Sequence, residues 1–352
     1  NFSPDDRFLC YDTRPPDGNI ANGRTIEKVN VGTGEVTVLY KAKDPIQDFG
    51  PGMGAANYSH IKDEVMFICG KPTETGLRYA KTCRFGRIVD GDGSGETWIL
   101  DARDVTCPYT PGALRGGTHR HEPDGTGKYV GYTYNDQIMK ALGKDLRTIG
   151  VTVRDHPVSV DKDSLGENND GEGWSVLVVR VTPDPKPGTD EISYAAGDSW
   201  VGTHGYRRED GNLQMARAFV GRVRDKNGND VDELFVVDIP NDLTEPGKWG
   251  PLEGTPLDFP QPPAGTVQRR LTFTTDRPHP GIQGIARSSP DGSQISFLMA
   301  DKNGKQQVFL ISPLGGEPRQ ASFEPEGIAL APRWHPSGKR IVTVDNRNRL
   351  LL

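Results

Sequence analysis

Short runs of alternating apolar and polar residues recur along this chain, and each run follows a tight-turn sequence. The clearest copy is Ser-Pro-Asp-Gly at residues 289–292, followed by Ile-Ser-Phe-Leu at residues 295–298. Related copies begin at Ser3 and at His335, and each leads into an apolar or β-branched run. Proline presets φ for the first turn position, aspartate and glycine suit the tight positions, and an alternating run is typical of a β-strand. The pattern therefore predicts a recurring unit of turn and strand.

The spacing of these units predicts a β-propeller. About 46 residues separate Pro290 from Pro336, which is about the length of one propeller blade. Degenerate copies at residues 58–63 and 121–125 extend the series toward the N-terminus. Division of the 352 residues by a blade of about 45 to 50 residues gives seven or eight blades, and long loops favour seven. We therefore expect an all-β fold, a seven-bladed β-propeller of four-stranded antiparallel blades.

We expect a single propeller domain over residues 1–352, interrupted by two long loops. Residues near 155–173 are polar and rich in turn residues, and residues near 240–263 are rich in proline. Apolar residues at helical spacing within 136–146 predict one short helix. Both interrupting segments are predicted to be long surface loops.

The composition excludes two classes of function. The mean hydropathy is -0.60, and no run of about 18 apolar residues occurs, so we expect no membrane insertion. The 48 acidic residues outnumber the 42 basic ones and give a net charge of -6, which argues against nucleic acid as a partner. The four cysteines match neither zinc-binding spacing nor a dense disulfide framework. A local basic groove remains compatible with this charge.

Two histidine-containing segments are the first candidates for a site. His119 and His121 are two residues apart, so in a regular strand both imidazoles would point to the same face. His204 follows a similar Gly-x-x-His pattern, in which glycine permits close approach of the backbone to a ligand or to a neighbouring strand. We expect the two segments to meet at one end of the propeller channel. The alternative is that these histidines only form hydrogen bonds between blades.

A cationic set follows His204 in this otherwise acidic protein. Tyr206, Arg207 and Arg208 come first, and Arg217 and Arg222 lie in the next apolar strand. Such clustering concentrates positive potential locally. The alternative for Arg207 and Arg208 is that they are solvated arginines at a strand edge, and this alternative is weaker for Arg217, which lies beside an apolar strand core.

Together these side chains suit β-elimination from a uronic acid polymer. Arginine or a charged histidine neutralises the sugar carboxylate, so the adjacent C–H becomes acidic, and tyrosine or histidine transfers protons. A cation next to Tyr206 would lower the pKa of its phenol, which makes this residue a candidate base or acid. A divalent metal held by His119, His121 and His204 is the lesser alternative. Motifs of serine hydrolases, P-loop proteins and zincins are absent from the sequence.

Three longer runs of the chain resemble a known family. They are Gly116–His121 with Tyr132–Asp136, Asp198–Tyr206, and Leu310–Pro318. These runs are similar to a family of uncharacterised bacterial TolB-like propeller proteins over nearly the whole chain. That family is in turn similar to propeller-type ulvan lyases and, more distantly, to oligogalacturonate lyases.

The resemblance implies roles for specific residues. The ulvan lyases use a tyrosine and a histidine as base and acid, and a histidine and an arginine neutralise the uronate carboxylate. Carried over by position, the catalytic candidates are Tyr206, His121, His119, His204, Arg222 and Arg217. Tyr134, Asn135, Arg207 and Arg208 are the candidates for substrate binding. Oligogalacturonate lyases bind manganese through a glutamine and a His-x-His element, but Gly116 stands where that glutamine is expected, so we expect no required cofactor and no metal site.

These observations favour a polysaccharide lyase that cleaves an anionic, ulvan-like polysaccharide by β-elimination. The expected partner is an anionic polysaccharide or oligosaccharide, and the expected state is a monomer. The expected location is periplasmic or secreted. The alternative function is that of a non-catalytic TolB-like propeller that binds a protein or a glycan, because fold alone does not fix function.

Overall fold

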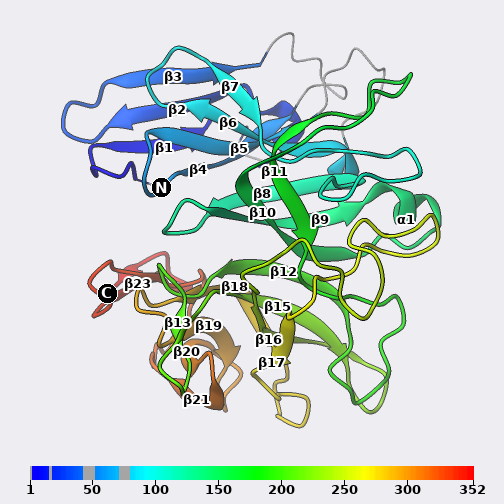
Figure 1. The fold of residues 1–352 in the computed structure, drawn as a ribbon. Helices are drawn as coiled ribbons and strands as arrows, with labels where there is room; N and C mark the ends of the chain where they lie inside the picture. The colour runs from blue at the N-terminus through cyan, green and yellow to red at the C-terminus, as the bar shows by residue number, and fades with distance from the viewer. Residues whose placement is uncertain (1, 16–17, 43–51, 71–79) are drawn as a thin grey trace. The chain divides into compact units, whose positions relative to one another are not determined.

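The computed structural model describes residues 2–15, 18–42, 52–70 and 80–352 (Figure 1). Its secondary structure is almost entirely β, and the described residues divide into two compact units. Unit 1 contains residues 1–145, 150–177 and 243–263, and unit 2 contains residues 146–149, 178–242 and 264–352. Within the described residues, no helix is long and apolar enough to cross a membrane.

Unit 1 holds three antiparallel meanders. The first is β1 (Phe8–Asp12), β2 (Thr25–Asn30) and β3 (Val36–Lys41). The second is β4 (Met53–Tyr58), β5 (Glu64–Gly70), β6 (Arg84–Asp90) and β7 (Thr97–Ile99). The third is β8 (Gly116–Pro123), β9 (Tyr129–Asp136), β10 (Arg147–Val158), which begins in unit 2, and β11 (Gly171–Leu177). The predicted short helix is α1 (Gln137–Ala141), and two 3-10 turns lie at Ile20–Asn22 and Lys81–Cys83.

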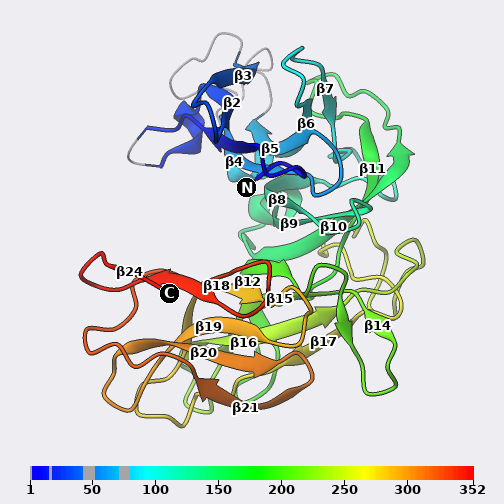
Figure 2. The same cartoon turned by 90° about the vertical axis from the view of Figure 1, so that its left-hand side faces the viewer.

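Unit 2 also holds three meanders. The first is β12 (Ile192–Trp200), β15 (Ala216–Arg224), β16 (Asp230–Asp238) and β17 (Val267–Arg270). The second is β18 (Ile282–Ser288), β19 (Ile295–Ala300), β20 (Gln306–Ser312) and β21 (Gly315–Gln320), which lie side by side in Figure 2. The third is β22 (Arg333–Trp334), β23 (Ile341–Val344) and β24 (Leu350–Leu351). A separate hairpin pairs β13 (Tyr206–Arg207) with β14 (Leu213–Gln214).

These meanders are propeller blades, so the predicted all-β propeller class is confirmed, but the predicted number of seven is wrong. The described residues form six blades, three in each unit. The estimate of seven allowed for long loops but too little for the difference in blade length, because β18–β21 occupies residues 282–320 whereas β12–β17 occupies residues 192–270. Residues 239–266 connect β16 to β17 without a further strand, and residues 159–170 connect β10 to β11. The residues that the estimate assigned to a seventh blade therefore lie in long connections between strands.

Aromatic pairs across neighbouring strands fill the core of unit 2. Phe219 lies opposite Phe235, and the ring centroids are 5.6 Å apart. Phe297 lies opposite Phe309 in the next blade, at 6.2 Å. These rings are at most 4% exposed, and such cross-strand aromatic pairs add stability beyond the area that they bury. In these two blades the central strands β15, β16, β19 and β20 are mostly buried.

The turn predicted from the sequence repeat recurs in five of the six blades. In each copy a backbone N–H donates to the carbonyl five residues later, at 2.8 to 2.9 Å. The donor and acceptor pairs are Ser3 and Phe8, Ser59 and Glu64, Asp124 and Tyr129, Ser289 and Gln294, and His335 and Arg340. The corresponding connection of the remaining blade, between β12 and β15, is the longer segment 201–215, which contains the β13–β14 hairpin. We call this segment the 201–215 insertion.

Candidate functional site

The 201–215 insertion is fixed at its base and against the neighbouring blade. The Val201 N–H donates to the Ala216 carbonyl, at 2.9 Å, which closes the insertion. The Thr203 N–H donates to the Pro290 carbonyl in the next blade, at 2.8 Å. Gly202 has φ +68°, and a Cβ atom there would lie 2.9 Å from the Cα of Gly292. The predicted close approach of glycine to a neighbouring segment therefore occurs here, and it seats the insertion on the 289–294 turn.

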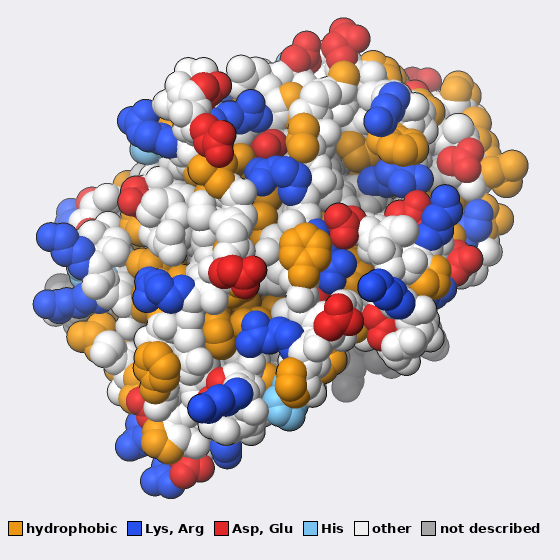
Figure 3. Space-filling model, turned by 90° about the horizontal axis from the view of Figure 1, so that it is seen from below, with side chains coloured by type: hydrophobic (Ala, Val, Ile, Leu, Met, Phe, Trp, Pro, Cys, Tyr) orange, Lys and Arg blue, Asp and Glu red, His pale blue; other side chains and the backbone are white. Residues whose placement is uncertain are grey.

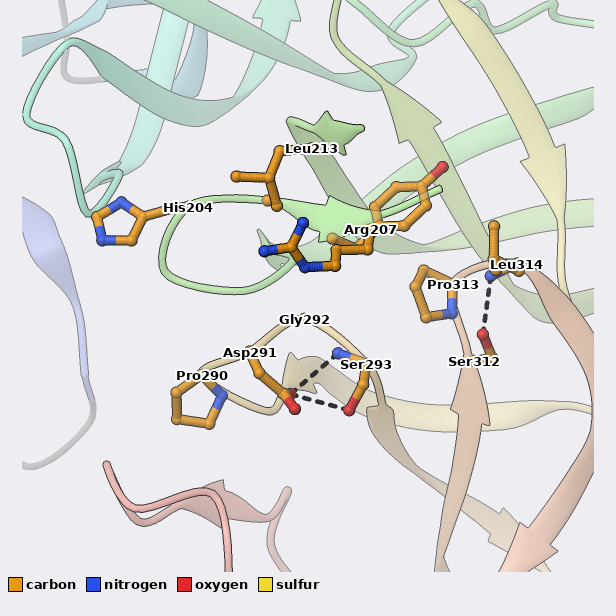
Figure 4. A pocket seen from close by; sticks show the side chains of 12 residues that line it. His204, Arg207, Leu213, Pro290, Asp291, Gly292, Ser293, Ser312, Pro313 and Leu314 are labelled. Carbon is orange, nitrogen blue, oxygen red and sulfur yellow. Dashed lines mark hydrogen bonds between the residues drawn. The ribbon is translucent and has the colours of Figure 1, made fainter. Parts of the chain in front are cut away.

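A pocket of about 450 Å³ lies between this insertion and the β18–β21 blade (Figure 4). Two of its polar side chains, His204 and Arg207, are exposed and come from the insertion. The apolar side chains of the wall are Leu213, Pro290, Pro313 and Leu314. Asp291 also lines the pocket, and its carboxylate accepts hydrogen bonds from the Ser293 N–H and hydroxyl, at 3.0 and 2.9 Å. The pocket thus combines an imidazole, a guanidinium and a carboxylate with apolar walls.

Tyr206 also lines this pocket, but its hydroxyl is engaged in the interior. The hydroxyl donates to Asp238 Oδ1, at 2.9 Å, and accepts from Arg269 Nη2, at 2.9 Å. Arg269 also contacts Asp238 Oδ1 at 3.2 Å and donates to the Pro313 carbonyl at 3.0 Å. Tyr206 is 2% exposed, so its phenol packs inside the pocket wall and its hydroxyl does not face solvent.

The expected lowering of the Tyr206 pKa is wrong. Burial raises the pKa of this phenol, and the neighbouring Asp238 carboxylate raises it further. Arg269 and Arg208 act in the opposite direction but do not outweigh these two causes. The sequence showed the cation next to Tyr206, whereas Asp238 and Arg269 lie in strands β16 and β17, where no local motif marks them. Tyr206 is therefore a neutral proton donor near pH 7 and not a ready base.

The remaining cationic candidates in unit 2 occupy three different environments. Arg208 lies 3.6 Å from Asp238 Oδ2 and is part of the Tyr206 cluster. Arg217 is fully buried, its Nε donates to Asp198 Oδ2 at 2.9 Å, and its guanidinium lies 4.7 Å from the Trp200 ring. The third candidate, Arg222, faces Asp232 at 2.7 Å on the partly exposed end of the same strand. Neither Arg217 nor Arg222 lines the pocket with His204.

In unit 1, His119 and His121 point to opposite faces of β8, so the expectation of a shared face is wrong. Arg120 has φ +61°, and the pairing register with β9 shifts by one residue between His119 and Glu122. One extra residue in a strand reverses the alternation of side chains beyond it. His121 consequently shares a face with Thr118, whose hydroxyl lies 2.9 Å from His121 Nε2.

His121 is enclosed in the interior of unit 1. The side chain has no exposed surface, and its Nε2 lies 3.5 Å from Asp101 Oδ1. Its Nδ1 has no hydrogen-bond partner among the described residues. A Cβ atom on Gly86 would come within 2.7 Å of this imidazole, so the strand next to it leaves no space for a ligand.

The other candidates of unit 1 also have partners within the unit. Tyr134 is 1% exposed, and its hydroxyl donates to Asp136 Oδ2 at 3.0 Å. Asn135 is 2% exposed and donates to Asp145 Oδ1 at 3.0 Å. His119 is half-buried, and its backbone carbonyl accepts a hydrogen bond from the Thr133 hydroxyl at 3.4 Å. Because these residues and His204 belong to different units, the meeting of the two histidine segments stays a prediction.

The described residues contain no group of three or more histidine, cysteine, aspartate and glutamate side chains that could hold a metal ion. His119 and His121 cannot chelate one ion from the same face of β8, because the bulge separates them. Whether the protein needs a cofactor stays a prediction.

The fold places this chain among the all-β propeller proteins. Residues 52–167 match the family model described as protein of unknown function (DUF3748). The chain is also 42% identical over 360 residues to the uncharacterized protein YidR of Escherichia coli (strain K12), over 98% of this chain and 81% of that protein. It belongs to the same family as YidR.

Solved structures are similar to this chain in fold alone. An oligogalacturonate lyase in complex with manganese has a TM-score of 0.50 and 13% identity, over 99% of this chain and 73% of that chain. A putative TolB from Agrobacterium tumefaciens has a TM-score of 0.44 and 15% identity, over 91% of this chain and 77% of that chain. The predicted resemblance to TolB-like propellers and to oligogalacturonate lyases is thus confirmed as a likeness of fold. The predicted resemblance to ulvan lyases stays a prediction.

Proposed function

We propose that this protein binds an anionic saccharide of the uronate-containing class in the pocket between the 201–215 insertion and the β18–β21 blade. The observation that carries the proposal is the joint lining of one pocket by the exposed guanidinium of Arg207, the carboxylate of Asp291 and apolar side chains. The guanidinium suits the sugar carboxylate, the carboxylate accepts hydrogen bonds from sugar hydroxyls, and proline and leucine pack against the C–H face of the ring. The volume falls within the range of about 300–1,000 Å³ that is typical of small-molecule sites.

Selectivity for an anion would come from these local groups. On the face drawn in Figure 3, lysine and arginine side chains are interspersed with aspartate and glutamate, and the chain carries a net charge of -6. A polyanion is therefore not attracted by the overall charge of the protein. Arg207 and Arg208 of the insertion are the cations closest in sequence to the pocket-lining His204, and both are exposed.

A binding assay with matched saccharides tests the proposal. We expect calorimetry to detect binding of galacturonate and ulvan oligosaccharides and no binding of a neutral oligosaccharide of the same length. Arg207→Gln should weaken that binding about tenfold or more, because it removes a charge-assisted hydrogen bond. Arg319→Gln, at an exposed position of β21, is the matched control and should leave binding unchanged. Equal affinity for the neutral saccharide, or an unchanged affinity of Arg207→Gln, would refute the proposal.

β-Elimination at this pocket is the second candidate function, because the exposed side chains of His204 and Arg207 line the same pocket. The imidazole would remove the proton next to the carboxylate, the electron pair of that C–H bond would form a C=C bond, and the glycosidic C–O bond would break. The departing oxygen would then take up a proton. The 201–215 insertion supplies the His204 imidazole and the Arg207 guanidinium, whereas the Tyr206 hydroxyl is hydrogen-bonded to Asp238.

An ultraviolet assay of the unsaturated product separates binding from catalysis. For a lyase, absorbance rises on incubation with polygalacturonate or ulvan, and His204→Gln abolishes the rise while calorimetric binding persists. A binding protein gives the calorimetric signal with no increase in absorbance. Exhaustive chelation before the assay shows whether any lyase activity depends on a metal.

A further inference from the structure

A second pocket, of about 560 Å³, lies at the other end of the β18–β21 blade. Its walls come from the β19–β20 turn at residues 301–305, from β20, from the end of β21 and the segment after it, and from Arg277. The first pocket is lined by the 290–293 turn that precedes β19, whereas this one is lined by the turn that follows β19. A strand of six residues spans about 20 Å, so the two pockets are separate sites.

Three cations of this second pocket have no partner for their charge. Arg277, Lys302 and Lys305 line it, are exposed, and make no side-chain ion pair or hydrogen bond within the described part of the chain. The two carboxylates of the pocket are engaged elsewhere. Asp301 Oδ1 accepts from the backbone N–H groups of its own turn at 2.8 and 3.0 Å, and Glu324 Oε2 faces Arg349 at 3.4 Å. The three cations are therefore available to a ligand.

An aromatic side chain is held in the open beside these cations. Phe323 lines the pocket and is 76% exposed. Both of its neighbours are tied to the buried amide of Gln307, which accepts from the Ser322 hydroxyl at 2.7 Å and from the Glu324 N–H at 3.0 Å. The same amide donates to the Glu324 carbonyl at 2.8 Å. These hydrogen bonds hold the residues on either side of Phe323, so the segment that carries the exposed ring is anchored at the pocket.

We propose that this pocket binds a small organic anion that carries a flat ring, an aryl or heteroaryl phosphate or carboxylate. The anionic group would lie among Arg277, Lys302 and Lys305, and the ring would stack on Phe323. Cations without partners attract an anion without first having to break an internal ion pair, and an exposed aromatic ring adds stacking that tolerates different ring types. The site is independent of the saccharide pocket and of the function proposed for it.

Adenosine monophosphate is a suitable probe, with inorganic phosphate and adenosine as its two halves. We expect the nucleotide to bind more tightly than either half in calorimetry or ligand-observed NMR, and to weaken with added salt. Lys302→Gln/Lys305→Gln should weaken binding about tenfold or more, and Phe323→Ala about fivefold. Lys339→Gln, an exposed lysine of the next blade, is the matched control and should bind like the unmodified protein.

Four results would overturn the proposal. The first is that neither the nucleotide nor naphthyl phosphate binds at millimolar concentration. The second and third are that adenosine alone, or phosphate alone, binds as tightly as the nucleotide. The fourth is that Lys302→Gln/Lys305→Gln and Phe323→Ala both bind the nucleotide with the affinity of the unmodified protein. Circular dichroism of the variants confirms that they are folded, which we expect because the substituted side chains are exposed. Competition with a uronate saccharide should leave nucleotide binding unchanged, since the two pockets lie at opposite ends of the blade.

Discussion

Replacement of Arg217 by methionine separates a structural role from a catalytic one. Arg217 and Asp198 are 0% and 1% exposed, so the substitution leaves a buried carboxylate without the guanidinium that faces it. Loss of one partner of a buried ion pair costs about 3–5 kcal/mol. We therefore expect Arg217→Met to lower the free energy of unfolding by about 4 kcal/mol.

The shift in melting temperature depends on how much of the chain unfolds together. With an unfolding entropy of about 2.1 cal/mol/K per residue, 4 kcal/mol lowers Tm by about 5 °C if all 352 residues unfold as one. If unit 2 unfolds alone, with roughly 160 residues, the same change lowers Tm by about 12 °C. Scanning calorimetry distinguishes these two values and so also reports whether the units are coupled.

Two further variants make this prediction refutable. Arg222→Met breaks the pair with Asp232, whose side chains are 39% and 30% exposed, and should cost less than about 1 kcal/mol. Arg217→Met/Asp198→Asn removes both buried charges and should recover at least half of the lost stability. An unchanged Tm of Arg217→Met, or a double variant as unstable as the single one, would contradict the role of this buried pair. Below its Tm, Arg217→Met should still bind saccharide.

Three other predictions concern the glycine of the histidine segment, the buried phenol and the insertion. Gly117→Ala places a Cβ atom 2.1 Å from the Lys81 carbonyl, so we expect a lower Tm of unit 1 by calorimetry, with a cost of about 1–3 kcal/mol or more, and a normal Tm would contradict this packing. Because the pKa of Tyr206 is higher in the folded state than in the unfolded state, its contribution to stability is complete below pH 10 and is lost as the pH rises above 10. We therefore expect the Tm of the unmodified protein to fall more steeply with alkaline pH than the Tm of Tyr206→Phe. Replacement of residues 201–215 by a Ser-Pro-Asp-Gly turn should keep the β-sheet circular dichroism and nucleotide binding but abolish saccharide binding, and retained saccharide binding would place that site elsewhere.

Local sequence patterns predicted the turns well because their determinants lie within a few residues. In the copy at 289–294, the Ser289 hydroxyl donates to the Asp291 carboxylate at 2.6 Å and accepts from the Gln294 N–H at 3.0 Å. Such a turn is encoded by its own side chains, even in degenerate copies. The two longest connections were predicted from local composition, but the number of blades depends on the total length of every blade with its connections, which no local pattern gives.

The site was predicted less well because its chemistry depends on contacts between distant strands. Arginine does act on the pKa of Tyr206 in the expected direction, but burial of the phenol, together with Asp238 thirty-two residues away along the chain, reverses the net shift. In β8, one residue with positive φ at Arg120 separates His119 from His121. Neither the partner of a buried phenol nor the position of a bulge can be read from periodicity alone.

The departure of one blade from the repeat is itself evidence on where function lies. Five blades use a six-residue turn before their second or equivalent strand, which is enough to connect the strands. The 201–215 insertion is longer than connection requires, yet it is fixed by the Thr203 hydrogen bond and by the packing of Gly202 on Gly292. His204 and Arg207 of this insertion line a pocket, and the Tyr206 hydroxyl anchors the insertion by donating a hydrogen bond to Asp238. A segment that is unnecessary for the blade but ordered, and that carries exposed imidazole and guanidinium groups, is best explained by a ligand that those groups contact.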